Sequence, residues 1–195
     1  MKTRTISAII AMIILASTNV SARETLAKAT KGKFLMGVAI NMQQVNGVNP
    51  VESDLIANEF SAVVAENCMK PQPTHPQENK YVWDDADKFV AFGEKNKQTV
   101  TGHCLIWHSQ IGRWMFVNDS GKDVSPEVLK ERMRQHIYAV VGRYKGRVKG
   151  WDVVNEAFED NGTYRKSKFY QILGKDFIKY AFQFAHEADP NAELY

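Results

Sequence analysis

Apolar residues along this chain gather in five short runs, and within each run they are continuous rather than alternating with polar residues. The runs occupy residues 33–40, 60–67, 98–107, 147–156 and 192–195. A strand that is covered on both faces shows such a run, whereas a half-exposed strand alternates. We therefore predict five buried strands, the last of which begins only at the final four residues.

The segments between these runs repeat their apolar residues at every third or fourth position, which predicts helices. The expected starts are Pro50 after an Asn49 cap, Asp84 acting as a cap, Ser125 followed by Pro126, and a last helical region over 167–188. The predicted inward faces of the last three are Ala86, Phe89, Val90 and Gly93; Leu129, Met133, Ile137, Val140, Val141 and Tyr144; and Ile178, Ala181, Phe182 and Ala185.

Strands and helices that alternate in this way indicate right-handed βαβ units and therefore a parallel sheet. Two α/β architectures fit the alternation, an open doubly wound sheet and a closed β/α barrel. Neither the dinucleotide-binding pattern nor the P-loop pattern of glycines follows any predicted strand. A nucleotide cofactor is therefore poorly supported.

The first 22 residues follow a different pattern. A basic start, "MKTR", precedes the apolar stretch "ISAIIAMIILAS" and a group of small residues that ends at Ala22. This order predicts a secretory signal peptide that is cleaved after Ala22, and a secreted or periplasmic protein. A membrane anchor is the alternative, but a spanning helix needs about 20 apolar residues. We expect residues 23–195 to form one domain that is not attached to a membrane.

Charge and cysteine content exclude few functions. Loss of Lys2 and Arg4 with the signal peptide leaves 23 basic and 22 acidic residues, a formal net charge of +1. Such a balance gives no electrostatic reason to expect nucleic acid as a partner. Cys68 and Cys104 both fall in or beside predicted strands, so an exported protein could bridge them or bury them as free thiols.

Polar residues cluster where the predicted strands end. The group consists of Glu66, Asn67 and Lys70 after the second strand, His103, Trp107, His108 and Gln110 in or after the third, and Asn155 and Glu156 at the end of the fourth. The carboxyl ends of parallel strands share one edge, and ligands bind at that edge in both candidate architectures. These side chains are therefore expected to form one site.

The residue types in this group suit a sugar better than a metal ion. Amides, carboxylates and Lys bind hydroxyl groups, and a Trp ring stacks on the apolar face of a pyranose. His103 and His108 lack the spacing of a helical zinc pair, and no G-x-S-x-G turn positions a nucleophilic serine. Cys104 follows His103 directly, and neighbours in a strand point to opposite faces. A metal site or a Cys–His nucleophile is therefore not predicted.

Three motifs in this group, "AENCMK", "GHCLIWHSQ" and "GWDVVNEA", closely resemble the N-terminal half of family-10 glycoside hydrolases, the endo-β-1,4-xylanases. The resemblance extends from about Phe34 to Tyr195. It implies a (β/α)₈ TIM barrel, of which this chain would hold about four and a half βα units. It also implies hydrolysis of xylan or xylo-oligosaccharides with retention of configuration and without a cofactor.

The resemblance also implies a role for each polar residue. Glu156 aligns with the general acid/base, and Asn155 with the residue that binds the sugar 2-hydroxyl at subsite −1. The remaining substrate-binding positions would be His103 and Trp107 at subsite −1, and Glu66, Asn67 and Lys70 at subsites −2 and −1. Without the resemblance, the residues also allow purely structural roles: a buried ion pair for Glu156, a hydrogen-bonded core position for His103 and a solvated position for Lys70.

A retaining glycosidase also needs a second carboxylate about 5 Å across the scissile bond. In the family this nucleophile follows the seventh strand, whereas Tyr195 lies in the fifth. Two hypotheses follow: the sequence is the front half of a xylanase, or it is a truncated, non-catalytic remnant that binds xylan or glucan. The motifs leave open whether the sugar is xylose or another β-1,4-linked unit.

Overall fold

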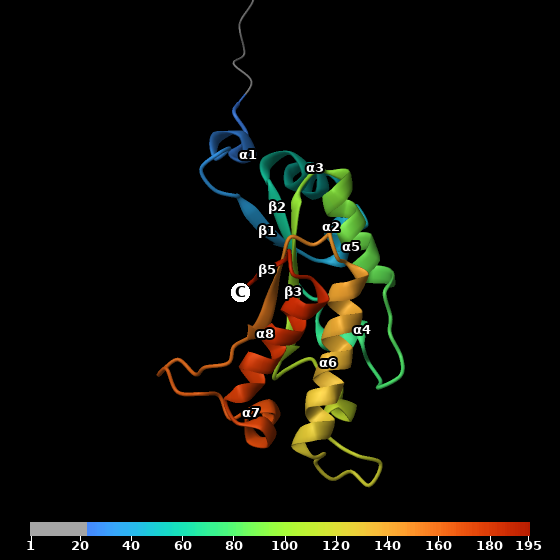
Figure 1. Ribbon diagram of the computed structural model, residues 1–195. Helices are drawn as coiled ribbons and strands as arrows, with labels where there is room; N and C mark the ends of the chain where they lie inside the picture. The colour runs from blue at the N-terminus through green and yellow to red at the C-terminus, as the bar shows by residue number, and fades with distance from the viewer. Residues whose placement is uncertain (1–22) are drawn as a thin grey trace, which may run out of the picture.

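The computed structural model describes residues 23–195, so the predicted signal peptide lies outside the described residues (Figure 1). Its strands are β1 (Gly37–Ile40), β2 (Ala62–Ala65), β3 (Thr99–Trp107), β4 (Gly150–Asn155) and β5 (Glu193–Leu194). They form one parallel sheet in the order β1-β2-β3-β4-β5. A doubly wound sheet reverses its strand order at a switch point. The consecutive order is that of a β/α barrel.

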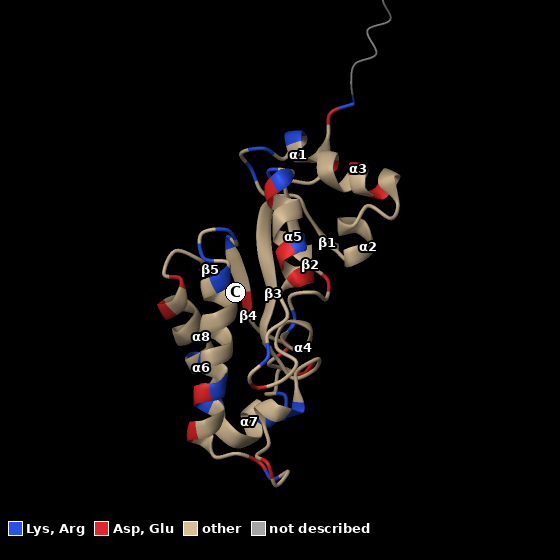
Figure 2. Ribbon diagram, turned by 90° about the vertical axis from the view of Figure 1, so that its right-hand side faces the viewer, with Lys and Arg blue, Asp and Glu red and all other residues tan. Residues whose placement is uncertain are grey.

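One short helix precedes β1, and the other helices lie between consecutive strands. They are α1 (Leu26–Ala29), α2 (Met42–Val45), α3 (Pro50–Glu59), α4 (Pro71–Thr74), α5 (Asp84–Lys95), the 3₁₀ turn η1 (Arg113–Met115), α6 (Pro126–Arg143), α7 (Lys168–Leu173) and α8 (Asp176–Ala188). The long helices α5, α6 and α8 cover one face of the sheet (Figure 1). Figure 2 shows that charged residues lie mostly on helices and loops and that the strands carry few.

Hydrogen bonds confirm the predicted helix starts at Asn49 and Ser125. The Asn49 side chain accepts from the Val51 N–H at 3.1 Å, and the Ser125 hydroxyl accepts from the Val128 N–H at 3.4 Å. The prediction of Asp84 as a cap was wrong, because it is the first residue of α5 itself. There its carboxylate lies in the first turn, where the helix dipole favours negative charge.

The predicted helical region over 167–188 is divided into α7 and α8. Gly174, with φ +63° and ψ −159°, interrupts it in a backbone region that is nearly exclusive to glycine. The new helix start also changes the inward face. The buried positions of α8 are Phe177, Ala181, Phe184 and Ala185. Ile178 and Phe182 are instead partly exposed and line a hollow beside β4.

The core lies between the sheet and the helices, and the predicted inward faces of α5 and α6 are buried there, as is Tyr144, which follows α6. Close packing limits the side chains that fit. A Cβ atom on Gly102 would lie 2.2 Å from the Trp151 ring on the neighbouring strand. Cys68 and Cys104 are both free and buried, and burial raises the pKa of each thiol to about 12. The alternative of a disulfide is therefore not realised.

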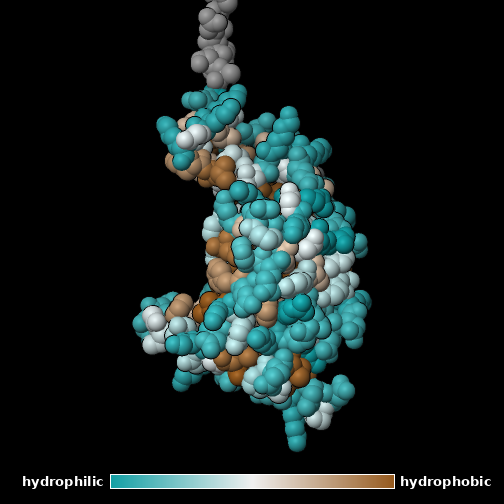
Figure 3. Space-filling view, viewed as in Figure 1, coloured by the Kyte–Doolittle hydropathy of each residue, from teal (hydrophilic) through white to brown (hydrophobic). Residues whose placement is uncertain are grey.

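The opposite face of the sheet is concave, and no helix from residues 23–195 covers it (Figure 1). Apolar residues gather along this hollowed side, at the left of the space-filling view (Figure 3). Val38, Val64, Thr101 and Asp152 line part of it, from four adjacent strands. Among residues 23–195, no helix combines the length and apolar character that crossing a bilayer requires.

Candidate active site

The register of β3 and β4 brings the predicted site residues of these two strands together. His103 lies opposite Asp152, and Trp107 lies opposite Asn155. Between these pairs β3 holds one residue more than β4, which is a bulge. Bulges redirect side chains next to functional sites. Both His103 and Trp107 consequently contact side chains of the β4 segment.

Glu156 follows β4 directly and is held through its carboxylate. The Trp107 Nε1–H donates to Glu156 Oε2 at 2.9 Å, and His108 Nδ1 lies 3.7 Å from the same oxygen. The Glu156 side chain is 48% exposed. A buried ion pair is therefore excluded for Glu156. An exposed carboxylate that accepts one indole hydrogen bond can still exchange a proton with a ligand.

His103 is oriented by a carboxylate that sequence reasoning missed. Its Nδ1 lies 2.8 Å from Asp152 Oδ2, and both side chains are partly exposed toward the concave face. Because an ionised carboxylate only accepts, the proton sits on Nδ1 and Nε2 is left free for another partner. The available signal was a single carboxylate inside an otherwise apolar strand, opposite a histidine.

The residues that follow β2 form a second group at the same edge. Lys70 Nζ donates to Asn67 Oδ1 at 2.9 Å and lies 4.6 Å from the centre of the Trp107 ring. Lys70 is only 8% exposed, so a solvated surface position is excluded. Its cation instead links this group to Trp107 through the ring face.

Glu66 is tied to a residue that sequence reasoning also missed. Asn41, which caps α2 directly after β1, donates from Nδ2 to Glu66 Oε2 at 3.2 Å. Asn155 is partly exposed beside Trp107. The carboxyl ends of β1 to β4 thus contribute to one polar edge.

Of the other three histidines, two lie in the core and one lies on the surface. His75 and His136 are buried and their Nδ1 atoms lie 3.1 Å apart, whereas His186 is exposed on α8. Within residues 23–195, no three His, Cys, Asp or Glu side chains gather in a manner that could hold a metal ion.

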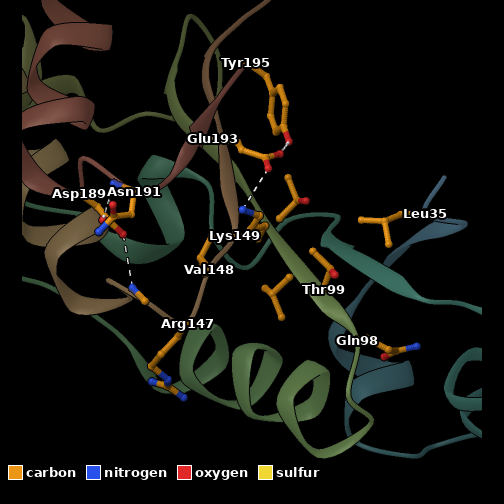
Figure 4. Close-up of a pocket in the computed structure, with 13 residues that line it drawn as sticks. Leu35, Gln98, Thr99, Arg147, Val148, Lys149, Asp189, Asn191, Glu193 and Tyr195 are labelled. Atoms are coloured by element: carbon orange, nitrogen blue, oxygen red, sulfur yellow. Dashed lines mark hydrogen bonds and ion pairs between the residues drawn. The ribbon is translucent and has the colours of Figure 1, made fainter. Parts of the chain in front are cut away.

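A separate pocket of about 390 Å³ lies at the opposite edge of the sheet (Figure 4). It is formed at the amino ends of the strands, where Lys149 and Glu193 form an ion pair at 3.1 Å and Tyr195 bonds to Glu193. In β/α barrels the amino ends of strands serve stability, and chemistry occurs at the carboxyl ends. The edge that carries Glu156 is therefore the candidate active site.

The sequence matches Glycosyl hydrolase family 10 over residues 25–195. The chain belongs to this family. Endo-1,4-beta-xylanase A of Xylanibacter ruminicola is 52% identical over 185 residues, which cover 94% of this chain and 50% of that protein. Endo-1,4-beta-xylanase B of Paenibacillus barcinonensis is 40% identical over 173 residues, which cover 88% of this chain and 51% of that protein.

Solved structures agree with these relatives. A family 10 endoxylanase from a sugarcane soil metagenome superposes with a TM-score of 0.81 at 48% identity, over 85% of this chain and 48% of that one. A psychrophilic family 10 endo-beta-1,4-xylanase gives 0.83 at 44% identity, over 88% and 54%. The chain thus spans about half the length of the relatives it matches. Its five parallel strands correspond to part of the family's (β/α)₈ barrel.

Proposed function

We propose that residues 23–195 form the N-terminal part of the catalytic barrel of an endo-1,4-beta-xylanase, with Glu156 as its general acid/base. The observation that carries this proposal is the position of Glu156. Its exposed carboxylate ends a barrel strand and accepts a hydrogen bond from Trp107, within one edge that gathers side chains able to bind a sugar. The xylanase relatives, half of whose length the chain matches, support the same reaction.

In the proposed reaction Glu156 transfers a proton twice. Its protonated carboxyl gives a proton to the glycosidic oxygen as the bond from that oxygen to C1 breaks, while a second carboxylate attacks C1 and forms a glycosyl ester. Glu156, now ionised, then takes a proton from a water molecule that attacks C1, which breaks the ester bond and frees both the sugar and the second carboxylate. We propose that the second carboxylate belongs to the part of the barrel that follows Tyr195.

The remaining polar residues would hold the sugar. His103 keeps Nε2 free because Asp152 occupies Nδ1, and Nε2 can bind a hydroxyl of the xylose at subsite −1. Trp107 offers a ring face and Asn155 an amide at the same subsite. The group that consists of Glu66, Asn67 and Lys70 would bind the xyloses at subsites −2 and −1. We also propose export through the predicted signal peptide, residues 1–22.

Substitution of Glu156 by Gln in the full-length product tests the proposal. Gln neither donates an acidic proton nor accepts one from water, so kcat on xylan should fall by about 10²–10⁴-fold with little change in KM. Asp160→Asn is the matched control, because Asp160 is an exposed carboxylate in the same loop and should be dispensable. Release of reducing sugar from xylan measures both.

The same experiment separates the alternative of a sugar-binding remnant. If neither the parent protein nor the variants release reducing sugar, and the parent binds xylo-oligosaccharides in a calorimetric titration, the binding function is supported instead. Undiminished hydrolysis by Glu156→Gln would contradict its role as the acid/base. Titration with cello-oligosaccharides beside xylo-oligosaccharides decides which β-1,4-linked sugar is preferred.

A further inference from the structure

The backbone of Glu156 is strained. Its φ of +52° lies in the left-handed region, which residues other than glycine, asparagine and aspartate rarely adopt. Such a conformation costs free energy and persists only where the surroundings determine it. Trp107 holds the carboxylate of Glu156, but that contact does not fix the main chain. Another group must therefore stabilise the peptide unit that bends the chain at this point.

Arg165 provides that group. Its Nε–H donates to the Glu156 carbonyl at 3.0 Å, and Nη2 lies 3.5 Å from the Phe158 carbonyl. Nη1 pairs with Glu159 Oε2 at 3.1 Å. The Arg165 backbone N–H also donates to the Ala157 carbonyl at 2.9 Å. One residue thus contacts four consecutive residues that begin with Glu156.

Arg165 is brought there by a hairpin-like loop. Phe158 and Tyr164 form an antiparallel bridge, and the Glu159 N–H donates to the Thr163 carbonyl at 2.8 Å. Gly162, with φ +80°, makes the turn that these contacts require. The loop projects from the edge of the sheet at the lower left of Figure 1. Its return places Arg165 beside the carboxyl end of β4, where it contacts the Glu156 carbonyl. The guanidinium side chain is 28% exposed, so part of it is shielded from water.

We propose that Arg165 is a positioning residue for the acid/base, an inference that rests on the proposed function of Glu156. Its guanidinium holds the Glu156 carbonyl and thereby fixes the left-handed turn that aims the carboxylate at the glycosidic oxygen. Arg165 does not contact that carboxylate and transfers no proton. The planar fork of arginine suits this task because it reaches several acceptors at once, whereas the point charge of lysine does not.

The proposal predicts a loss that depends on the leaving group. A displacement of about 1 Å in a catalytic group can cost about 100-fold in rate. Proton donation matters most when the departing oxygen is strongly basic, as in xylan or a phenyl xylobioside. A 2,4-dinitrophenyl xylobioside needs no proton to depart. Poor placement of Glu156 should therefore slow the first two substrates selectively, whereas general damage to the site would slow all three.

Arg165→Lys in the full-length enzyme tests this prediction. It retains the positive charge beside Glu159 but removes the Nε–H that binds the Glu156 carbonyl. We expect kcat/KM to fall by about 10–100-fold on xylan and on the phenyl substrate. On the dinitrophenyl substrate kcat/KM should be unchanged, while kcat falls because ester hydrolysis needs the base. Azide, which attacks the ester without a base, should restore that kcat.

Two further variants guard the interpretation. Glu159→Gln removes the ion pair but keeps the Nε–H bond to Glu156, so it should alter no substrate by more than about threefold, because exposed ion pairs contribute little. Arg147→Lys alters an arginine–carboxylate pair remote from the site and should have no effect on any substrate. If Arg165→Lys lowers kcat/KM equally on all three substrates, or lowers it on none, the positioning role is overturned. If Glu156→Gln itself lacks the leaving-group dependence, the acid/base assignment fails first, and the role of Arg165 fails with it.

Discussion

At the scale of single residues, the pairing of His103 with Asp152 decides which nitrogen of the ring faces a ligand. The carboxylate lies 2.8 Å from Nδ1, so that nitrogen carries the proton. A histidine without this partner could carry its proton on either nitrogen. In the tautomer protonated on Nε2, that nitrogen could no longer accept a hydrogen bond from a ligand. Asp152 would thus act through His103 in the proposed binding of the sugar.

Asp152→Asn should lower kcat/KM on xylo-oligosaccharides without unfolding the protein. The amide occupies the same volume but no longer fixes the proton on Nδ1. A hydrogen bond to a charged group is worth about 1.5–3 kcal/mol. We therefore expect kcat/KM of the full-length enzyme to fall by about 10–100-fold, measured on xylotetraose. The Asp160→Asn variant serves as the control, and equal kcat/KM for Asp152→Asn and the parent would contradict the role of Asp152.

Most of the residues in the polar edge could be identified in the sequence, but two of their partners could not. Glu66, Trp107 and Glu156 stand out because each follows or ends an apolar run, where a buried polar group would be costly. Asn41 also follows an apolar run and Asp152 interrupts one, but neither position shows which side chain it contacts. Their roles depend on which residues lie opposite in the sheet, and the bulge in β3 changes that register by one residue. No local pattern specifies a register between distant segments.

At the scale of elements, two buried histidines connect the loop after β2 with α6 and β3. Nδ1 of His75 lies 3.1 Å from Nδ1 of His136. The outer nitrogen of each ring lies at hydrogen-bond distance from a backbone carbonyl, His75 Nε2 at 2.9 Å from Glu78 and His136 Nε2 at 3.0 Å from Leu105. The loop that carries Lys70 is thereby fixed to the strand that carries Trp107.

The histidine pair should make folding sensitive to acid. Burial lowers the pKa of His75, and burial together with the neighbouring His75 lowers the pKa of His136 to about 3. The hydrogen bond to the Glu78 carbonyl and the charge of the Glu78 carboxylate raise the pKa of His75 but do not outweigh burial. That carboxylate is paired with Arg132, and Tyr81 stacks on the His75 ring. The folded protein therefore holds its two rings neutral, while the unfolded chain protonates them near pH 6.5.

The sign of the effect follows from the direction of both shifts, because the pKa of each ring is lower in the folded protein than in the unfolded chain. Stability from the pair is fully present above about pH 6.5 and is lost as the pH falls from there toward about 3. The slope should be at most about 1.4 kcal/mol per pH unit for each histidine. Urea denaturation of the full-length protein between pH 4 and pH 8 measures it. His136→Gln should flatten the slope and the exposed His186→Gln should not; a free energy of unfolding that stays constant below pH 6.5 would contradict the prediction.

Element boundaries were less predictable than element types. The stripes on α5 and α6 are regular enough that every predicted inward residue is buried. The division into α7 and α8 was missed because Gly174 inside a helical pattern is ordinarily tolerated at a modest cost. Its positive φ depends on how α7 and α8 pack against α6, which a local pattern does not contain.

At the scale of the whole molecule, the five strands form a curved sheet, and the helices of residues 23–195 cover one of its faces (Figure 1). The strand order and the family membership both indicate a barrel, and the sequence alternation left this choice open against a doubly wound sheet. Periodicity predicts strands and helices but not the order of strands in the sheet. The three motifs favoured the barrel because they resemble a family that has this fold. Phe34 and Leu35 are 60% and 58% exposed, and the edges of β1 and β5 have no neighbouring strand among residues 23–195.

This architecture predicts the behaviour of a polypeptide that is confined to residues 23–195. Unpaired strand edges and an exposed apolar face promote association between copies. The proposed nucleophile would also be absent, so Glu156 would have no partner carboxylate across the scissile bond. Such a polypeptide should elute as aggregates from a size-exclusion column and should release no reducing sugar from xylan.

Completion of the barrel should reverse both properties. Co-expression with the second half of the 52% identical Xylanibacter ruminicola xylanase supplies the missing strands and a second carboxylate, because the chain matches half of that protein. We expect a soluble complex with measurable xylan hydrolysis that Glu156→Gln abolishes. The same co-expression with an unrelated β/α half-barrel is the control and should rescue nothing. A monodisperse polypeptide of residues 23–195 that hydrolyses xylan alone, and loses this activity on Glu156→Gln, would show that the described residues already contain a complete catalytic site.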